Sequence, residues 1–139
     1  MTCKAISYIS SIRTNLTSKD LEDLIVFAEN SNNKNNVTGI FIVMDKNFYQ
    51  VIEGEPHTID VLFKKIQNDK RHNGLVKLFD QEIDAKIFES YIGGDFAVIK
   101  SRADLRKLKQ YLNWIKKADI PEINELLLLT ENFLKHNHQ

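Results

Sequence analysis

The stretch of residues 37–54, VTGIFIVMDKNFYQVIEG, constrains the fold more than any other part of this chain. Two runs of β-branched and aromatic residues flank Asp45-Lys46-Asn47, a pattern that predicts an antiparallel hairpin. Side chains alternate between the two faces of a strand, so Gln50 points the same way as Phe48 and Ile52. A buried amide without partners costs about 1–3 kcal/mol. An amide between two large apolar neighbours is therefore a first indication of a binding site.

Strands and helices alternate along the first hundred residues. Thr17 is a candidate cap for a first helix, with Asp20 completing a capping box, and this helix is expected to end within residues 30–36, which are rich in asparagine. Gly54-Glu55-Pro56 predicts the start of a second helix. Apolar residues recur at i, i+3, i+4 and i+7 in both, namely Leu21, Leu24, Ile25 and Ala28, then Ile59, Leu62, Phe63 and Ile66. The expected strands are residues 3–10, 37–44, 48–52, 75–79 and 91–99.

This order, βαββαββ, predicts an α+β fold: a ferredoxin-like sandwich with a mixed five-stranded sheet. Each of the two helices has a single apolar stripe, so both are expected to cover one face of the sheet. Residues 100–139 contain two more amphipathic helices, separated near Pro121, which are expected to cover the other face. The sequence thus predicts a main domain of residues 1–99 and a C-terminal helical extension of residues 100–139.

The composition narrows the class of protein. Nineteen basic and nineteen acidic residues leave no net charge, which argues against nucleic acid or an anionic membrane as the partner. No apolar run approaches the roughly 20 residues of a membrane span, and MTCKAISYIS lacks the layout of a signal peptide. The single cysteine, Cys3, fits a reducing cytoplasm. The histidines lack metal-ligand spacing with acidic or cysteine residues, so no metal site is predicted.

Several short motifs follow one another in a specific order and spacing over residues 5–96. They are Tyr8 and Ser10 on the first strand, LTSKDL at the first helix, Asn32 six residues before Thr38, VTGIFI, FYQVIEG with Gln50, and NDKRH after the second helix. In this combination the chain resembles the BLUF domain, a small flavin-binding sensor of blue light. Each motif alone is weak, and the resemblance depends on their order.

The resemblance implies a light switch built on Tyr8 and Gln50. Tyr8 would donate an electron and a proton to the excited flavin, and Gln50 would lie between Tyr8 and the N5 and C4 carbonyl edge of the ring. A glutamine amide offers an acceptor on one side and donors on the other. Its rotation or tautomerisation therefore changes which flavin atoms receive hydrogen bonds, and the new bond to the flavin carbonyl would give the red-shifted signalling state of the family.

The resemblance also implies the remaining contacts of the cofactor. Asn32 would hydrogen-bond the opposite part of the ring edge, Ser10 would support the network, and Arg71 and His72 would lie near the flavin phosphate. The ring would lie between the two helices, against Leu24, Ile25, Phe48, Leu62 and Ile66. The cofactor is expected to be FAD, with FMN or riboflavin as alternatives.

The fifth strand departs from the family pattern. The family carries a tryptophan and, two residues on, a methionine there, after a phenylalanine. Here Phe88 is followed by Tyr91, Ile92 and Gly93, so Tyr91 is expected to take the place of the tryptophan and Gly93 that of the methionine. This replacement would affect how a signal from Gln50 reaches the fifth strand, and it offers Tyr91 as a second redox-active phenol.

The expected activity is that of a non-enzymatic photoreceptor. Residues 100–139 are too few for a cyclase or phosphodiesterase domain, so the output is expected to be homo-oligomerisation or binding of a separate downstream protein. A rival interpretation is a small ferredoxin-like hydrolase of acylphosphatase type. It needs an arginine beside a water-orienting asparagine, and the best candidates are Arg13 with Asn35 or Asn36. A third interpretation is a flavin-free ligand-sensing or scaffold domain.

Overall fold

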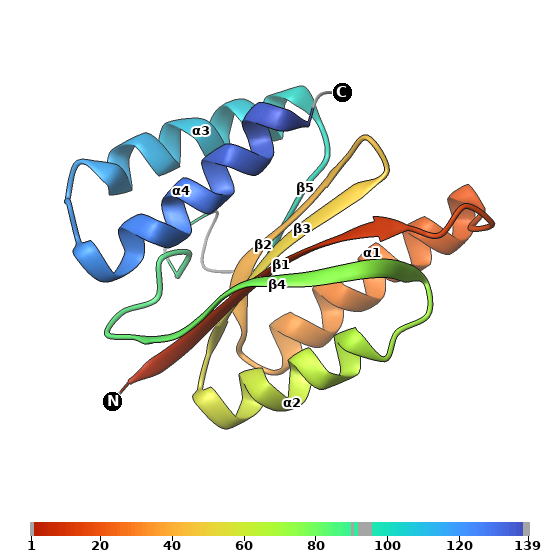
Figure 1. Cartoon of the computed structure of the whole chain (residues 1–139), viewed down its shortest axis with the longest axis horizontal. Helices are drawn as coiled ribbons and strands as arrows, with labels where there is room; N and C mark the ends of the chain where they lie inside the picture. Colours follow the sequence, from red (N-terminus) through yellow and green to blue (C-terminus); the bar gives the residue numbers. More distant parts are fainter. Residues whose placement is uncertain (1, 90, 92–95, 138–139) are drawn as a thin grey trace.

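The computed structural model describes residues 2–89, 91 and 96–137 as a sheet with a pair of helices on each face (Figure 1). The elements, in chain order, are β1 (Cys3–Ile12), α1 (Ser18–Lys34), β2 (Thr38–Met44), β3 (Asn47–Gly54), α2 (Pro56–Gln67), β4 (His72–Ile83), β5 (Ala97–Ile99), α3 (Arg102–Lys116) and α4 (Pro121–His136). The strand order is β4-β1-β3-β2-β5, with β2 and β5 parallel and the other neighbours antiparallel. The predicted α+β sandwich with a mixed five-stranded sheet is confirmed.

The hairpin of β2 and β3 closes through a two-residue turn. Asp45 and Lys46 have φ values of 50° and 65°, which is the type I′ geometry that matches the twist of the flanking strands. Asn47, which the sequence placed in the turn, is the first residue of β3. In β2, Gly39 has a φ of 144°, and a Cβ there would lie 1.9 Å from the Val51 carbonyl oxygen, so this position requires glycine.

Both helices that face the hairpin begin as the sequence predicts. Thr17 and Asp20 form the capping box of α1, and the Glu55 side chain accepts hydrogen bonds from the first backbone N–H groups of α2. The asparagine-rich run remains helical to Lys34, and the chain leaves the helix through Asn36, whose φ is 59°. Asn32 therefore lies on the last turns of α1, where its side chain is held by a rigid element.

The two outer strands differ from their predicted bounds. β4 extends from His72 to Ile83, because it pairs along almost all of β1 through two register shifts that the hydrophobic pattern does not reveal. β5 contains only Ala97–Ile99, pairs with β2, and does not include Tyr91. The expected strand over residues 91–99 is wrong at its N-terminal end, and Gly93 and Gly94 within it lie outside the described residues.

Each face of the sheet has its own hydrophobic cluster. α1 and α2 cover the face to which Tyr8, Phe48 and Ile52 point, and α3 and α4 cover the face to which Tyr49 and Val51 point (Figure 1). The predicted placement of the two helix pairs is thus confirmed. Over the ranges that the structure describes, no helix combines the length and apolar character needed to span a membrane.

Candidate functional site

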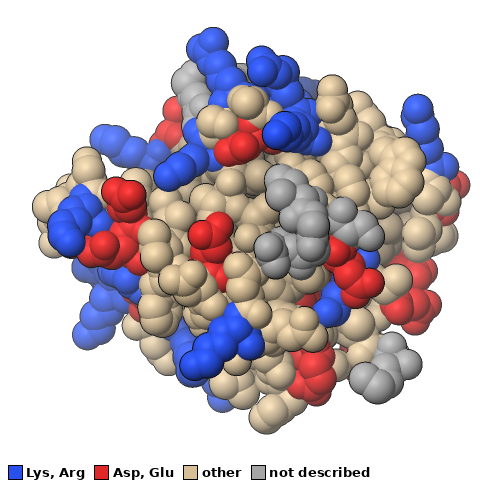
Figure 2. All heavy atoms as spheres, turned by 180° about the vertical axis from the view of Figure 1, so that it is seen from behind, with Lys and Arg blue, Asp and Glu red and all other residues tan. Residues whose placement is uncertain are grey.

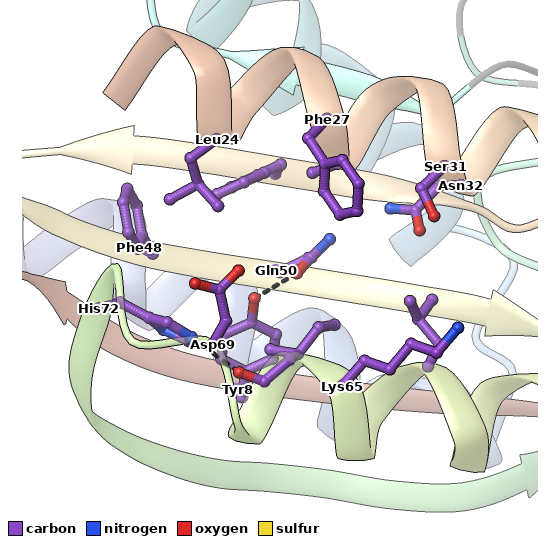
Figure 3. Close-up of a pocket in the computed structure, with 14 residues that line it drawn as sticks. Tyr8, Leu24, Phe27, Ser31, Asn32, Phe48, Gln50, Lys65, Asp69 and His72 are labelled. Atoms are coloured by element: carbon purple, nitrogen blue, oxygen red, sulfur yellow. Dashed lines mark hydrogen bonds between the residues drawn. The ribbon is translucent and has the colours of Figure 1, made fainter. Parts of the chain in front are cut away.

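A pocket opens between α1 and α2, and the middle of β3 forms part of its floor (Figure 3). Its walls are two helical stripes with the same spacing of i, i+3, i+4 and i+7. The stripe from α1 consists of Leu24, Phe27, Ala28 and Ser31, with Asn32 beside it, and the stripe from α2 and its C-terminal turn consists of Leu62, Lys65, Ile66 and Asp69. The strands contribute Tyr8, Phe41, Phe48, Gln50 and His72.

Tyr8 and Gln50 meet on the floor of this pocket. They are register partners in the antiparallel pair of β1 and β3, so their side chains project from directly opposite positions on the same face. The Tyr8 hydroxyl donates a hydrogen bond to Gln50 Oε1. Burial raises the pKa of the Tyr8 phenol far above its ordinary value, and the negative charge of Asp69 adds to the shift. The phenol therefore stays protonated at neutral pH and remains the donor.

The orientation of the Gln50 amide follows from this bond. Because the phenol gives its single proton to Oε1, the amide nitrogen points the other way, toward the end of the pocket where Ser31 and Asn32 lie (Figure 3). Asn32 is only 2% exposed. The pocket thus holds two amide side chains, one from β3 and one from α1, within otherwise largely apolar walls.

His72 anchors the other end of the pocket. Its Nε2 lies 2.9 Å from the Ile66 carbonyl oxygen, and its Nδ1 lies 2.8 Å from Ser10 Oγ. A carbonyl only accepts, so Nε2 carries a proton, and in the neutral ring the Ser10 hydroxyl donates to Nδ1. Ser10 does not line the pocket; it fixes the histidine that does.

Arg71 and Asp69 form a close ion pair at the rim of the pocket. Arg71 Nη2 lies 2.7 Å from Asp69 Oδ2, and these hydrogen bonds lower the pKa of the Asp69 carboxyl, against the opposing effect of its partial burial. The Arg71 guanidinium also lies 5.5 Å from the centre of the Phe27 ring, on α1. Arg71 therefore joins the two sides of the rim and positions two lining residues, although it is not itself part of the lining.

Most of the predicted site residues come together in this pocket. Its lining includes Tyr8, Leu24, Asn32, Phe48, Gln50, Leu62, Ile66 and His72, and it does not include Ser10, Ile25 or Arg71. Ile25 is buried but lies one position round the helix from Leu24. The contact of each residue with a flavin stays a prediction.

Sequence reasoning missed six lining residues: Phe27, Ala28, Ser31, Phe41, Lys65 and Asp69. A signal for five of them was present, because they continue the i, i+3, i+4, i+7 series that starts at Leu24 or at Leu62. The amphipathic stripe read from the sequence starts three residues earlier in each helix, at Leu21 or Ile59, and includes the side chains that pack on the sheet.

The fifth strand also requires a correction. Tyr91 packs in the cluster beneath α3, with its ring 4.8 Å from that of Tyr111, and its hydroxyl has no hydrogen-bond partner within the described part of the chain. The residues around β5 that face the pocket side are Phe96 and Val98, which share the family's spacing of two residues. Tyr91 therefore lies outside β5 and in the layer opposite the pocket, and of these three residues only Phe96 and Val98 belong to the pocket-side cluster. Gly93 lies outside the described residues.

The positions of the candidate residues contradict the hydrolase interpretation. Arg13 precedes the N-terminal end of α1, whereas Asn35 and Asn36 follow its C-terminal end. A helix of 17 residues is about 25 Å long. The proposed pair therefore lies at opposite ends of a rigid helix and cannot act on one phosphate.

Comparison with known proteins agrees with this site. A family model described as BLUF, sensors of blue-light using FAD, matches residues 4–92. The chain belongs to the BLUF family. The match contains the Tyr8 and Gln50 pair and the helices that flank it.

Curated relatives are light-regulated signalling proteins. The chain is 28% identical over 115 residues to the photoactivated adenylate cyclase subunit alpha of Euglena gracilis, covering 83% of this chain and 11% of that protein. It is 30% identical over 81 residues to the blue light- and temperature-regulated antirepressor BluF of Escherichia coli (strain K12), covering 58% of this chain and 20% of that protein. The chain thus spans between a tenth and a fifth of the length of these relatives.

Solved BLUF structures share the architecture, which is ferredoxin-like. A structure described as the photo-activated state of BlsA has a TM-score of 0.67 and 25% identity, covering 94% of this chain and 91% of that chain. The dark-state structure of BlrB, a BLUF protein, has a TM-score of 0.65 and 25% identity, covering 90% and 92%. These similarities extend over the C-terminal helices as well as the sheet.

Proposed function

We propose that this blue-light sensor uses Tyr8 and Gln50 as its photoactive pair. The observation that carries the proposal is the hydrogen bond from the Tyr8 hydroxyl to Gln50 Oε1 on the floor of the pocket between α1 and α2. The pair is buried, so its hydrogen bond is not exchanged with water, and the pocket gives the free side of the amide access to a ligand.

The lining suits a flavin. An isoalloxazine is a flat, largely apolar ring system with a polar edge, and such ligands favour aliphatic walls with a few convergent polar groups. Leu24, Leu62 and Ile66 supply the walls, and Gln50 and Asn32 supply the amides. When bound, a flavin would supply the absorption of blue light and an electron acceptor. FAD is the form that the family description names, and FMN or riboflavin carries the same ring.

Tyr8 and Gln50 can hold two arrangements of hydrogen bonds. In the observed one, the phenol proton fixes Oε1 and leaves the amide NH₂ group facing the pocket. Loss of an electron and a proton from Tyr8 removes the donor that holds Oε1 in place. Rotation or tautomerisation of the amide then presents different donors and acceptors to the pocket, and this rearranged amide is the signalling form in our proposal.

We propose that residues 1–99 sense light and that residues 100–139 carry the output, without catalysis by this chain. α3 has five basic side chains, Arg102, Arg106, Lys107, Lys109 and Lys116, against one acidic residue, Asp104. Figure 2 shows Lys and Arg gathered over the end of the molecule that the C-terminal helices form. Trp114 on the same helix is 65% exposed. These features favour an acidic downstream protein, in the cytoplasm, over a symmetric contact through α3, which would oppose like charges.

The absorption spectrum of the purified protein in darkness and under blue light tests the proposal. We expect a yellow protein whose flavin band shifts to the red under blue light and returns in darkness. A colourless protein that does not take up FAD, FMN or riboflavin would favour the flavin-free scaffold instead. A bound flavin without a reversible shift would overturn the roles of Tyr8 and Gln50.

Light scattering of the same sample distinguishes the two outputs. A change of molecular mass between darkness and blue light supports homo-oligomerisation as the output. A constant mass of the chain alone, with a mass increase only when a partner is added in one light condition, supports a separate downstream protein. The same mass under all conditions would contradict both.

A further inference from the structure

We propose that Tyr49 is the positioning residue through which a change at Gln50 reaches α4. The inference rests on the proposed function of Gln50 and adds the route by which its rearrangement leaves the sheet. Tyr49 directly precedes Gln50 on β3 and, because strand side chains alternate, projects from the opposite face. A displacement of the backbone at Gln50 therefore moves the base of the Tyr49 side chain as well.

In the hydrogen bond between the Tyr49 hydroxyl and Thr130 of α4, the donor and the acceptor can be assigned. The Tyr49 hydroxyl lies 2.6 Å from Thr130 Oγ1, and the Thr130 hydroxyl in turn lies 2.9 Å from the Leu126 carbonyl oxygen. A carbonyl accepts only, so the single proton of Thr130 goes to Leu126, and Tyr49 must be the donor to Thr130. Both side chains are at most 1% exposed, so water cannot replace either bond.

Two further contacts extend this bond into a seam between β3 and α4. The Tyr49 ring lies 5.2 Å from the Phe133 ring, and Asn47 Nδ2 donates to Asn137 Oδ1 at 2.8 Å. Thr130 and Phe133 are spaced i and i+3, which places them on one side of α4, and Asn137 is the C-cap residue of the same helix. Asn47 and Tyr49 lie on one face of β3, so two matching rows of side chains meet along the seam.

The seam differs from another polar link between the sheet strands and α4. Gln81 on β4 reaches Glu125 at 3.4 Å, but that bond is exposed to solvent and therefore replaceable by water. The seam, in contrast, joins α4 to the strand that carries Gln50. Breaking the buried hydrogen bond between Tyr49 and Thr130 would cost free energy, so a displacement of β3 favours a matching displacement of α4, and this coupling makes the seam a relay.

A second route has to be separated from the seam. Asn33 Oδ1, at the end of α1, accepts a hydrogen bond of 2.8 Å from the Phe96 backbone N–H, just before β5. This bond links the neighbour of Asn32 to β5 and not to α4. It predicts a response in β5, whereas the seam predicts a response in α4, so amide exchange of α4 discriminates between the two routes.

The experiment compares hydrogen–deuterium exchange of α4 in darkness and under blue light, in the full chain with its flavin. Tyr49→Phe removes the hydroxyl and keeps the ring beside Phe133, and Thr130→Val removes the acceptor in a side chain of similar shape. In both variants we expect the reversible red shift to persist and the light-induced change in α4 exchange to fall by about threefold or more. Thr130→Ser keeps a hydroxyl and should retain the response.

The matched control is Tyr111→Phe, which removes a hydroxyl of α3, in the same layer, that donates to the Ile87 carbonyl, an acceptor outside β3 and α4. It should leave the α4 response unchanged. If the unmodified chain shows the red shift but no light-induced change in α4, or if Tyr49→Phe retains the full change, the relay is overturned while the photoactive pair stands. Absence of a red shift in the unmodified chain would overturn the proposed function and the relay together.

Discussion

The two faces of the sheet are filled in different ways. On the α1 and α2 face, the amides of Gln50 and Asn32 line a pocket whose remaining walls are mainly apolar. On the α3 and α4 face, large apolar side chains pack directly on the sheet, and the Tyr49 hydroxyl is paired with Thr130. β3 contributes to both, since Gln50 and Tyr49 are neighbours in sequence. One strand can therefore place a switchable amide in a ligand site and a fixed phenol in a packed core, with only the alternation of side chains separating them.

The largest effect is expected for Tyr8→Phe. The substitution removes the donor to Gln50 Oε1 and leaves the aromatic ring in place, so flavin binding should persist while the reversible red shift is lost completely. Absorption spectroscopy in darkness and under blue light measures this. Tyr49→Phe is the matched control on the other face and should keep the shift. A normal photocycle in Tyr8→Phe would show that Tyr8, like Tyr49, is not needed for the red shift.

Gln50→Leu should also abolish the shift. Leucine has a similar volume and no donor or acceptor, so the pocket keeps its shape while the Tyr8 hydroxyl loses its partner. The dark spectrum should show bound flavin with no reversible change in band position under blue light. A persisting shift would mean that another side chain carries the switch.

The two layers should differ in their response to truncation of a leucine. Leu126→Ala removes a fully buried side chain from the α4 layer and should lower the free energy of unfolding by about 2–5 kcal/mol. Leu62→Ala acts on a partly buried side chain that lines the pocket, so its cost without flavin should be smaller, about 1 kcal/mol. Urea denaturation of the two variants without flavin measures the difference. Equal losses would show that the pocket side is packed as tightly as the other.

Alkaline pH should also weaken the α4 layer. Burial raises the pKa of Tyr49 to about 12 from an ordinary value of 10.0, although its bond with Thr130 acts in the opposite direction. Between these two pH values the folded state holds a proton that the unfolded chain has released. The stabilisation is therefore complete below pH 10 and falls as the pH rises toward 12, by up to about 1.4 kcal/mol per pH unit.

Urea denaturation between pH 9 and pH 12 in the unmodified chain and in Tyr49→Phe isolates this contribution. Tyr8 has its own raised pKa and contributes to the slope of both proteins, so only the difference between their slopes belongs to Tyr49. Parallel slopes would show that the Tyr49 phenol ionises in the folded protein as readily as in the unfolded chain.

The sequence determined the local elements and the direction in which each side chain points. The hairpin, the capping box at Thr17, the proline-led start of α2 and the opposite faces of Gln50 and Tyr49 all follow from spacing of a few residues, because turns, caps and strand alternation are local properties. The order of the family motifs also identified Tyr8, Asn32 and Gln50 as parts of one site.

Only the tertiary structure decided which distant side chains meet. The extent of β4 depends on its pairing with β1, and the restriction of β5 to Ala97–Ile99, without Tyr91, depends on its pairing with β2. The hydrogen bond from Tyr49 to Thr130 joins residues 81 positions apart. Such contacts arise from the closure of long loops around a shared core, and no periodicity within one segment encodes them.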